Sequence, residues 1–303
     1  MTMNEISYTI SFLVSFQFFI YIWTVKSNIT MFISKRSYFY LTSLFIYFII
    51  IITLHRLLFV PQFNFNINNA YQSKYPYLAL IVDDRTTHQV INAILNILKY
   101  LPNDWKIQMI IPVENWSFYN SSSLSSLIQN NRIFFTPLEL PRTDFSGHEY
   151  INLILTSASF WRQVEGEKVL YFQFDSVICS NSSYKLTDFL DYDYIGAPWS
   201  TGGCCNGGFS IRSRTKMIEL FENFPIRYQL HVTNEDVWIY RHLAQVNGRI
   251  APNSLAKQFS VESIYFPRPF AVHNPNLGRL GSENMKRLCD YCPEIRTITH
   301  HCK

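Results

Sequence analysis

Charged residues are scarce in this chain of 303 residues. Lys, Arg, Asp and Glu together make up 16% of it, and the formal net charge at pH 7 is only +4. These charges are scattered, so there is no basic stripe of the kind that binds nucleic acid, and nucleic acid is excluded as a partner. Disorder is excluded as well, because 48% of the residues are hydrophobic and 17% are aromatic.

The first 60 residues contain two runs that lack any charge, residues 7–25 and 37–54. Each is about long enough to cross a bilayer core, which takes roughly 20 apolar residues. A buried core helix is the alternative interpretation. A cleaved signal peptide fits less well, because no small-residue cleavage site follows either run. Residues 1–60 are therefore predicted to be a membrane anchor with one or two helices.

Basic residues set the expected orientation of this anchor. Those between the two runs are Lys26, Lys35 and Arg36, whereas Arg56 alone follows the second run. The positive-inside rule places the linker in the cytosol and the rest of the chain in the lumen. A chain that started at Met31 would have one signal anchor and would send its bulk to the same compartment.

The cysteines also suit a lumenal location. There are six of them, at positions 179, 204, 205, 289, 292 and 302, and an even number after an anchor favours disulfides. A zinc site at Cys289, Cys292 and Cys302 with His300 or His301 is the alternative, although no second half of a zinc finger is present. Asn115, Asn120 and Asn181 each begin an Asn-X-Ser sequon, as expected of lumenal surface loops.

After a polar stem at residues 61–76, strands and helices alternate. Strands are predicted at 77–82, 105–113 and 168–178, helices at 89–101 and 148–164, and a short helix followed by a strand within 122–138. This order is typical of an α/β fold whose mainly parallel or mixed sheet has helices on its faces. Further helices are predicted at 215–224 and 234–248, with Asn234 as N-cap, and an extended segment at 263–276 leads to His273.

Two polar segments follow predicted strands. "DDR", residues 83–85, comes after the first strand, and Asp175 ends the apolar run "LYFQF" that begins at residue 170. Ligands of such sheets bind at the carboxyl ends of the strands, so these segments are predicted to line a functional rim. The alternative is that Asp175 only caps a turn.

Five segments carry a family resemblance. "VLYFQFDSVICS", "DYDYIGAPW", "NGGFSIRSR", "NEDVW" and "PFAVHNP" occur in this order. Together they resemble a family that is catalogued as a domain of unknown function and is grouped with GT-A glycosyltransferases. The resemblance covers roughly residues 76–275 and implies a catalytic domain at 77–275, followed by a tail at 276–303 with cysteine and histidine. The third and fourth segments also resemble Golgi type II β-1,3- and β-1,4-glycosyltransferases, which implies a Golgi or ER membrane location.

The resemblance implies a cation site at the end of the fourth strand. GT-A enzymes hold a divalent ion on the diphosphate of a nucleotide sugar through an Asp-X-Asp motif, and a hard ion needs such carboxylate oxygens. Here Gln173 replaces the first aspartate, and Asp175 remains. His273 matches the position of a late histidine ligand, which Mn²⁺ tolerates better than Mg²⁺ does. Asp175 and His273 are therefore the predicted metal ligands.

Two carboxylates open the predicted helix at 234–248. Glu235 and Asp236 stand in its first turn, where the helix dipole stabilises negative charge, so helix capping is the simpler interpretation. The resemblance makes Asp236 the general base of an inverting transfer, with Glu235 binding acceptor hydroxyls. A base of this kind has to face the acceptor hydroxyl in a water-poor site.

The remaining predicted contacts concern the nucleotide-sugar donor, for which a UDP-sugar is expected. Trp199, Asn206, Gly207 and Gly208 are expected to line the sugar pocket, because glycine allows close approach and an aromatic face stacks on a sugar. Gln173 and Asn152 are weaker nucleotide candidates. Arg85 is the expected phosphate or uracil contact, or it pairs with Asp83 or Asp84. Cys204 and Cys205 are expected to bond to the C-terminal cysteines.

The leading hypothesis is a membrane-anchored lumenal glycosyltransferase whose acceptor is a glycan or a glycoprotein. A catalytically inactive relative that binds glycans or partners is the alternative, since the first carboxylate of the motif is missing. A polytopic membrane protein without enzymatic activity is a third hypothesis. The donor sugar, the acceptor and the linkage do not follow from the sequence.

Overall fold

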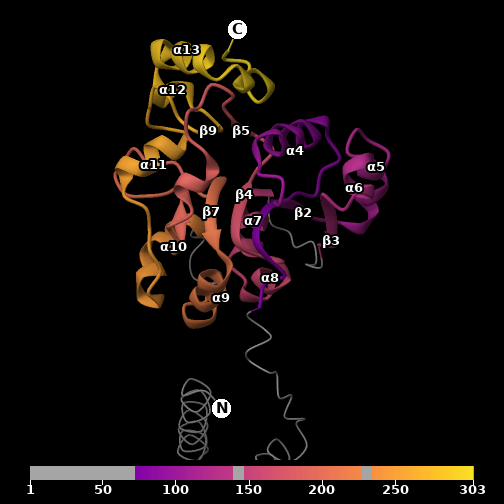
Figure 1. Ribbon diagram of the computed structural model, residues 1–303. Helices are drawn as coiled ribbons and strands as arrows, with labels where there is room; N and C mark the ends of the chain where they lie inside the picture. The colour runs from indigo at the N-terminus through magenta and orange to yellow at the C-terminus, as the bar shows by residue number, and fades with distance from the viewer. Residues whose placement is uncertain (1–71, 139–146, 227–233, 303) are drawn as a thin grey trace, which may run out of the picture. The chain divides into compact units, whose positions relative to one another are not determined.

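The computed structural model describes residues 72–138, 147–226 and 234–302, which all lie in the compact unit Phe65–Lys303 (Figure 1). Its main sheet has six strands in the order β3-β2-β1-β4-β7-β6. These are β1 (Tyr75–Val82), β2 (Lys106–Ile111), β3 (Ile133–Pro137), β4 (Gly166–Phe172), β6 (Tyr194–Ile195) and β7 (Phe209–Ser213). A smaller sheet in the order β5-β9-β8 joins β5 (Ser176–Ile178), β8 (Ser260–Val261) and β9 (Ala271–His273).

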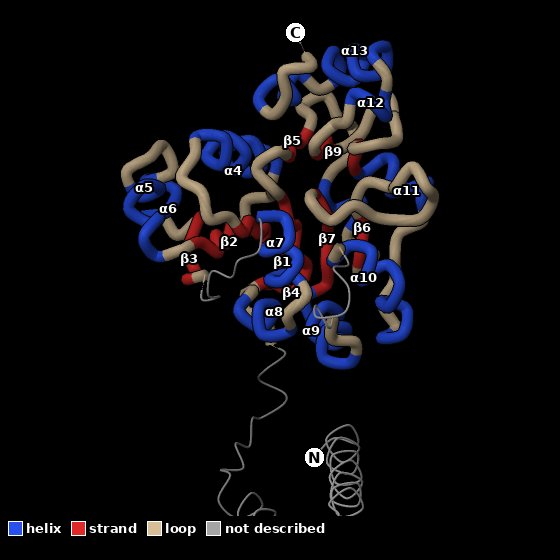
Figure 2. The backbone as a smooth tube through the Cα atoms, turned by 180° about the vertical axis from the view of Figure 1, so that it is seen from behind, coloured by secondary structure: helices blue, strands red, loops and turns tan. Residues whose placement is uncertain are grey.

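Helices flank both sheets, as Figure 2 shows from behind. The α-helices are α4 (His88–Tyr100), α5 (Trp116–Asn120), α6 (Ser125–Gln129), α7 (Gly147–Leu155), α8 (Ala158–Gln163), α9 (Arg214–Asn223), α10 (Glu235–His242), α11 (Asn253–Phe259), α12 (Leu277–Leu280) and α13 (Ser282–Tyr291). Short 3-10 turns are η1 (Val113–Asn115), η2 (Leu186–Phe189), η3 (Leu243–Val246) and η4 (Pro293–Thr297). The predicted α/β class with a mixed sheet flanked by helices is thus confirmed.

The central strands are buried on both faces, because helices cover them. All residues from Leu78 to Val82 in β1 and from Val169 to Phe172 in β4 are buried, as expected for parallel strands between helix layers. On α4, the side chains that face this core are Val90, Ile91, Ala93, Ile94 and Ile97, and Thr87 caps the helix by accepting from the Val90 amide.

The strand order reverses between β1 and β4. The chain moves outward from β1 to β2 and β3, all parallel, and then returns to place β4 on the other side of β1. β7 and β6 continue the sheet with antiparallel pairing. A reversal of this kind separates the loops at the carboxyl ends of the two central strands and creates the usual ligand position of open α/β sheets.

Two predicted elements are each split in the structure. The helix expected at 148–164 is α7 and α8, because the Thr156 hydroxyl donates to the Asn152 carbonyl and Ser157 adopts an extended conformation. The strand expected at 168–178 is β4 and β5, which belong to different sheets. Between them a turn forms, in which the Ser176 amide donates to the Gln173 carbonyl at 3.1 Å. Asp175 lies in this turn.

The helix expected at 234–248 is shorter than predicted. α10 ends at His242, and the tighter η3 turn continues to Val246. Asn247 then adopts a left-handed conformation with φ of 55°, and the Gly248 amide donates to the Leu243 carbonyl. This C-terminal cap ends the helix before the predicted boundary.

The C-terminal residues pack against the smaller sheet. Figures 1 and 2 both place α12 and α13 beside β5 and β9. A second hydrophobic cluster joins the two parts through Val177, Val261 and Val272 on the strands and Leu280, Met285, Leu288 and Ile295 on the C-terminal segment.

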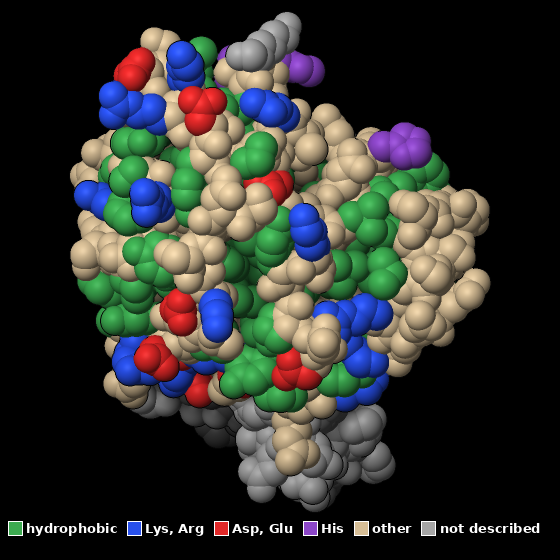
Figure 3. Space-filling model, turned by 45° about the horizontal axis from the view of Figure 1, so that its top comes forward, with side chains coloured by type: hydrophobic (Ala, Val, Ile, Leu, Met, Phe, Trp, Pro, Cys, Tyr) green, Lys and Arg blue, Asp and Glu red, His purple; other side chains and the backbone are tan. Residues whose placement is uncertain are grey.

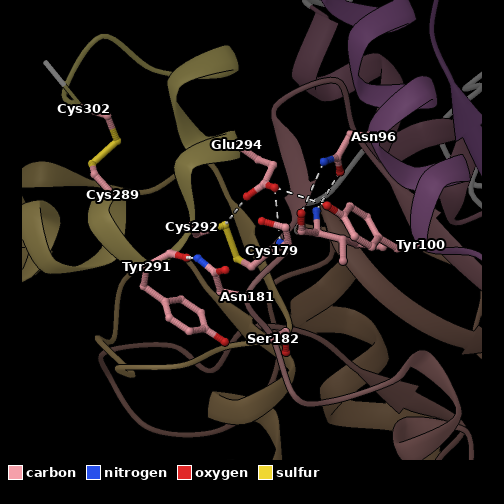
Figure 4. The surroundings of a disulfide bond; sticks show 12 residues. Asn96, Tyr100, Cys179, Asn181, Ser182, Cys289, Tyr291, Cys292, Glu294 and Cys302 are labelled. Atoms are coloured by element: carbon pink, nitrogen blue, oxygen red, sulfur yellow. Dashed lines mark hydrogen bonds between the residues drawn. A yellow bond between two sulfur atoms is a disulfide. The ribbon is translucent and has the colours of Figure 1, made fainter.

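Three disulfides connect all six cysteines, and two of them hold this C-terminal region (Figure 4). Cys179, just after β5, bonds to Cys292, and Cys289 bonds to Cys302. The zinc alternative is therefore wrong, since none of these thiolates is free to bind metal. The expected link from Cys204 and Cys205 to the C-terminal cysteines is also wrong.

Cys204 and Cys205 bond to each other across a cis peptide. Cys292 bonds to Cys179 instead, because β5 and the end of α13 lie side by side, and Cys289 bonds to Cys302. Near this contact, Glu294 accepts from the Tyr100 hydroxyl and the Ser180 amide, and Asn181 donates to the Tyr291 carbonyl (Figure 4).

The predicted membrane runs at 7–25 and 37–54 lie outside the described residues. Within the described ranges, no helix has the length and apolar composition that a bilayer crossing requires.

Candidate active site

Arg85 and Asp175 follow the two central strands at the reversal of strand order. Arg85 comes three residues after β1, and Asp175 comes three residues after β4. The Arg85 guanidinium lies 3.8 Å from the centre of the Phe174 ring, so the two loops are in contact. The two segments that were predicted to line a functional rim therefore lie in contact at this point of the sheet.

Arg85 is held by Asp83, as one of the sequence alternatives anticipated. Its Nε donates to Asp83 Oδ1 at 2.8 Å and its Nη2 donates to Asp83 Oδ2 at 2.6 Å. Asp83 is 4% exposed at its side chain, whereas Arg85 is 45% exposed. A bidentate pair of this kind fixes the direction of the guanidinium and leaves its remaining donors toward solvent.

Asp175, in the turn that precedes β5, and His273, at the end of β9, come together beside the small sheet. His273 ends β9, which pairs with β5 so that Ser176 lies opposite His273. The His273 Nδ1 lies 3.3 Å from Asp175 Oδ1 and 3.1 Å from the Ser176 hydroxyl oxygen. The contact with Asp175 lacks hydrogen-bond geometry, so Asp175 Oδ1 is a buried oxygen without a hydrogen-bond partner.

The charge state of Asp175 suits a ligand of cations. Burial raises the pKa of its carboxyl, but the interactions with His273, the backbone and Arg85 outweigh burial and hold the pKa below its ordinary value. Asp175 is thus an anion at neutral pH.

Gly207 and Gly208 connect this pair to α10. A β-carbon on Gly208 would lie 2.1 Å from His273 Nε2 and 2.8 Å from Gln173 Oε1. A β-carbon on Gly207 would lie 2.1 Å from Glu235 Oε1. Only glycine permits these approaches, which explains why the Gly-rich segment is needed here.

Asp236 lies on the other side of the two glycines. Its Oδ2 accepts a hydrogen bond from the Gly207 amide at 3.3 Å, and its Oδ1 accepts from the Val237 amide at 2.7 Å. The residue is 8% exposed. Burial and the neighbouring charge of Glu235 raise the pKa of Asp236 to about 7, which is the range in which a carboxylate acts as a general base.

Glu235 forms a buried ion pair. Its Oε1 accepts from Arg212 Nη2 at 2.8 Å, and Arg212 is fully buried. The same guanidinium donates to the Gly207 carbonyl at 2.9 Å and, through Nε, to the Ser210 hydroxyl at 2.9 Å. The pair of Glu235 and Arg212 therefore joins the start of α10 to β7 beneath the glycines.

The other candidates occupy defined positions around these groups. Asn152 on α7 accepts from the Glu235 amide at 3.0 Å, so it holds the start of α10, and its predicted nucleotide contact stays a prediction. Asn206 accepts from the Gly208 amide at 2.9 Å and its own amide donates to the Ala197 carbonyl at 2.7 Å. Trp199 packs edge-on against Tyr240 of α10, with ring centres 5.5 Å apart.

The side chains of Asp175 and His273 fit a divalent cation as ligands. Asp175 offers a carboxylate oxygen without a hydrogen-bond partner, and His273 offers an imidazole 3.3 Å away, a separation that one ion bound to both groups can bridge. In the part of the chain that the structure describes, no third His, Cys, Asp or Glu joins them. A cation held by two protein groups would keep open positions for phosphate oxygens and water.

Sequence reasoning missed Arg212, Ser176 and Tyr240. Arg212 stands in the quoted segment "NGGFSIRSR", and an arginine within an apolar strand was a signal of a buried ion pair. Asp83 was considered only as a partner of Arg85. Tyr240 follows Asp236 by one helical turn, which places both on one face of α10.

A family model described as "Protein of unknown function (DUF5672)" matches residues 135–273. The match spans four of the five quoted segments in full and ends at His273. It covers less than half of the chain and agrees with the expected resemblance to a family catalogued as a domain of unknown function. The resemblance to Golgi type II enzymes stays a prediction. No curated protein is significantly similar to the chain in sequence.

Several solved structures similar to the chain carry the names of glycosyltransferases. The apo form of GlyE from Streptococcus pneumoniae TIGR4 has 12% identity and a TM-score of 0.44, over 68% of this chain and 56% of that one. The bifunctional enzyme WbbM has 12% identity and a TM-score of 0.42, over 78% and 52%. The mannosyltransferase PcManGT from Pyrobaculum calidifontis, in complex with GDP-Man and Mn²⁺, has 10% identity and a TM-score of 0.40, over 76% and 69%. The chain thus spans little more than half the length of GlyE and WbbM, and similarity this low does not bear on its activity.

Proposed function

We propose that the protein is a glycosyltransferase that moves a sugar from a nucleotide-sugar donor to an acceptor hydroxyl. The observation that carries this proposal is the convergence of Asp175 and His273 on one side of Gly207 and Gly208 with Asp236 on the other. The proposed cation ligands and a carboxylate with a pKa of about 7 thus lie beside the same two glycines, which leave room for the side chains of Glu235 and His273.

In this proposal, the donor lies across the rim of the sheet. Its base and diphosphate occupy the end with Arg85, Phe174 and Asp175, where a guanidinium and an aromatic ring suit phosphate and a nucleobase. Its sugar lies against Asn206, Gly207 and Gly208. Asp236 faces the anomeric carbon from the opposite end of this row.

The reaction is a single displacement with inversion. The acceptor oxygen attacks the anomeric carbon and forms the new glycosidic bond, while the bond from that carbon to the diphosphate oxygen breaks. The nucleoside diphosphate leaves with the electron pair, and Asp236 takes the proton of the acceptor hydroxyl. The buried ion pair of Glu235 with Arg212 holds Asp236 in position for this transfer.

Asp175 and His273 would hold the divalent cation, for which Mn²⁺ is the expected ion because one ligand is imidazole. When bound, it supplies positive charge that stabilises the diphosphate leaving group. Asp175 contributes the carboxylate oxygen that has no hydrogen-bond partner in the protein.

The location we propose is the lumen of the Golgi or ER, with residues 1–60 as the membrane anchor. The support is that all six cysteines form disulfides, which persist in oxidising compartments and are rare in the cytosol. Protease protection of a C-terminal tag in microsomes tests this location, and digestion of the tag in intact microsomes would contradict it.

The decisive experiment is an assay of the full-length chain in detergent with a panel of UDP- and GDP-sugars. We expect release of the nucleoside diphosphate in the presence of Mn²⁺, loss of this release with EDTA, and its loss in Asp175→Asn. Absence of hydrolysis and transfer with every donor would refute the proposed function.

A second candidate function is a catalytically inactive protein that binds glycans or partners. It is favoured by one observation, that Gln173 stands where a first carboxylate would be and directs its Oε1 toward Gly208. Binding of UDP with Mn²⁺ in a thermal-shift assay, without turnover of any donor, would favour this candidate over the transferase.

A further inference from the structure

A closed loop stands beside the proposed base. Pro198 and Cys204 form an antiparallel bridge, the Trp199 amide donates to the Gly203 carbonyl at 3.3 Å, and the Gly202 amide donates to the Trp199 carbonyl at 3.1 Å. The disulfide from Cys204 to Cys205 joins two neighbouring residues at the end of this loop. This loop therefore holds Trp199 on a firm backbone.

The base of the loop is anchored to the main sheet. The Tyr194 hydroxyl on β6 donates to the Cys205 carbonyl at 2.8 Å, and both cysteines are buried. The loop is thus held by β6 and the start of α10 by β7, the strand that Gly207 and Gly208 precede.

The loop presents an aromatic pair together with α10. The rings of Trp199 and Tyr240 are 5.5 Å apart and nearly perpendicular, at 84°. Gly203 lies against Tyr240, where a β-carbon would come 3.1 Å from the ring and its hydroxyl. Tyr240 is nevertheless 42% exposed, so these contacts fix the ring without burying it.

A core role does not account for this exposure. Among the described residues, the large hydrophobic side chains classed as exposed are Leu95, Val113 and Tyr240, and Tyr240 alone of these is aromatic. It lies one helical turn after Asp236, on the same face of α10. An immobilised and open aromatic surface thus adjoins the proposed base.

The order of groups along the site identifies what this surface binds. Arg85 and Phe174 lie at one end, followed by Asp175 and His273, the two glycines, Asp236, and then Tyr240 with Trp199. The nucleotide belongs at the first end. The substrate that delivers its hydroxyl to Asp236 therefore enters at the end with the aromatic pair.

We propose that Trp199 and Tyr240 form the acceptor subsite and that the acceptor is a saccharide. This inference rests on the proposed function and names the acceptor class. An aromatic face packs against the apolar C–H face of a pyranose ring, and rings held in advance lose little freedom on binding. Trp199, which the sequence placed in the donor pocket, is thereby assigned to the acceptor.

The experiment compares the full-length wild-type chain with Tyr240→Ala, Tyr240→Phe and Trp199→Ala. Binding to an immobilised panel of lactose, N-acetyllactosamine, chitobiose and cellobiose is measured without donor, beside a Ser/Thr peptide, and hydrolysis of the preferred nucleotide sugar is measured separately. Leu95→Ala, at an exposed apolar residue of α4, is the control.

We expect wild-type binding to at least one saccharide, weakened about tenfold or more in Tyr240→Ala and Trp199→Ala and retained in Tyr240→Phe and in the control. Equal saccharide binding by wild type and Tyr240→Ala, or wild-type binding to the peptide alone or to no probe, would overturn the inference.

Failure of the proposed function gives a different result. In that case, no nucleotide sugar is hydrolysed by any variant, while saccharide binding that depends on Tyr240 persists. Such an outcome removes sugar transfer and retains the saccharide site.

Discussion

The amide of Gly207 donates a hydrogen bond to Oδ2 of Asp236 at 3.3 Å, and this contact joins the Gly-rich segment to α10. Asp236 is otherwise buried beside Glu235, whose charge makes ionisation less favourable. The contact therefore aims a carboxylate that is protonated more readily than usual at the row of glycines. Its protonation and position lead to the first three predictions.

Replacement of Asp236 by Asn should abolish transfer while the donor still binds. The amide keeps an oxygen for the Gly207 hydrogen bond but cannot accept a proton from the acceptor. We expect a loss of kcat by a factor of about 10²–10⁴ with little change in the KM for the donor. The measurement is steady-state transfer kinetics, and a variant that keeps a tenth of wild-type kcat would contradict the assignment.

The pH dependence of kcat/KM should follow Asp236. The base is active only when deprotonated, so activity should rise with pH through about 7 and level off above it. Glu235→Gln removes the neighbouring negative charge and should lower the pKa of Asp236, which moves the rise to lower pH. A profile that is unmoved in this variant would show that Glu235 does not control the base.

The free energy of unfolding should change with pH in the direction opposite to the activity. Asp236 keeps its proton up to about pH 7 in the folded protein, whereas in the unfolded chain the carboxyl releases it near its ordinary pKa of 3.8. Between these values the folded state binds more protons, so the free energy of unfolding falls as pH rises. The contribution is on the order of 2–4 kcal/mol.

Urea unfolding at several pH values tests this, with Asp236→Asn as the comparison. Groups such as Asp175, whose pKa is lowered, act in the reverse direction in both proteins and cancel in the difference. The difference in stability should therefore shift in favour of the variant from about pH 4 to about pH 7. A constant difference over this range would refute the raised pKa.

Replacement of Gly208 by Ala should disturb the cation ligands directly. The added methyl would meet His273 Nε2 and Gln173 Oε1, so the ring has to leave its present position beside Asp175. We expect a destabilisation of about 1–3 kcal/mol and loss of Mn²⁺-dependent donor hydrolysis. Gly147→Ala is the control, because an added β-carbon there meets nothing within 4 Å. Wild-type activity in Gly208→Ala would contradict the close approach.

The two C-terminal disulfides should differ in their effect on stability. Cys179 and Cys292 are 113 residues apart, whereas Cys289 and Cys302 are 13 apart. A longer loop loses more entropy on closure, so the double Ser variant of the first pair should lose about 4–5 kcal/mol and that of the second about 3 kcal/mol. Urea unfolding of both variants gives the comparison, and a reversed order would argue against the loop-entropy explanation.

The sequence predicted the strand and helix alternation because its central elements have clear patterns. β1 is a continuous apolar run, and α4 shows apolar residues at helical spacing, so both were predicted within a few residues of their bounds. The break between β4 and β5 was not predicted, because the apolar pattern continues across Asp175. Only the pairing of β5 with β9, which depends on residues almost 100 positions later, separates the two strands.

Within the candidate site, resemblance located Asp175, Asp236 and His273, whereas their supporting contacts depend on three-dimensional structure. The bond from Arg212 to Glu235 spans 23 residues and lies in the interior, where an arginine is seldom expected. The disulfide connectivity could not be predicted from the sequence either, since six cysteines allow 15 pairings.

The bond between Cys179 and Cys292 has a consequence for any shortened version of the protein. Cys179 stands four residues after Asp175, and its partner lies 19 residues beyond His273, past the last residue that the family model matches. A protein truncated at Pro275 would leave a buried thiol without its partner next to the very strand that sets Asp175 against His273. The residues after Pro275 therefore stabilise the arrangement of Asp175 and His273, the proposed cation ligands.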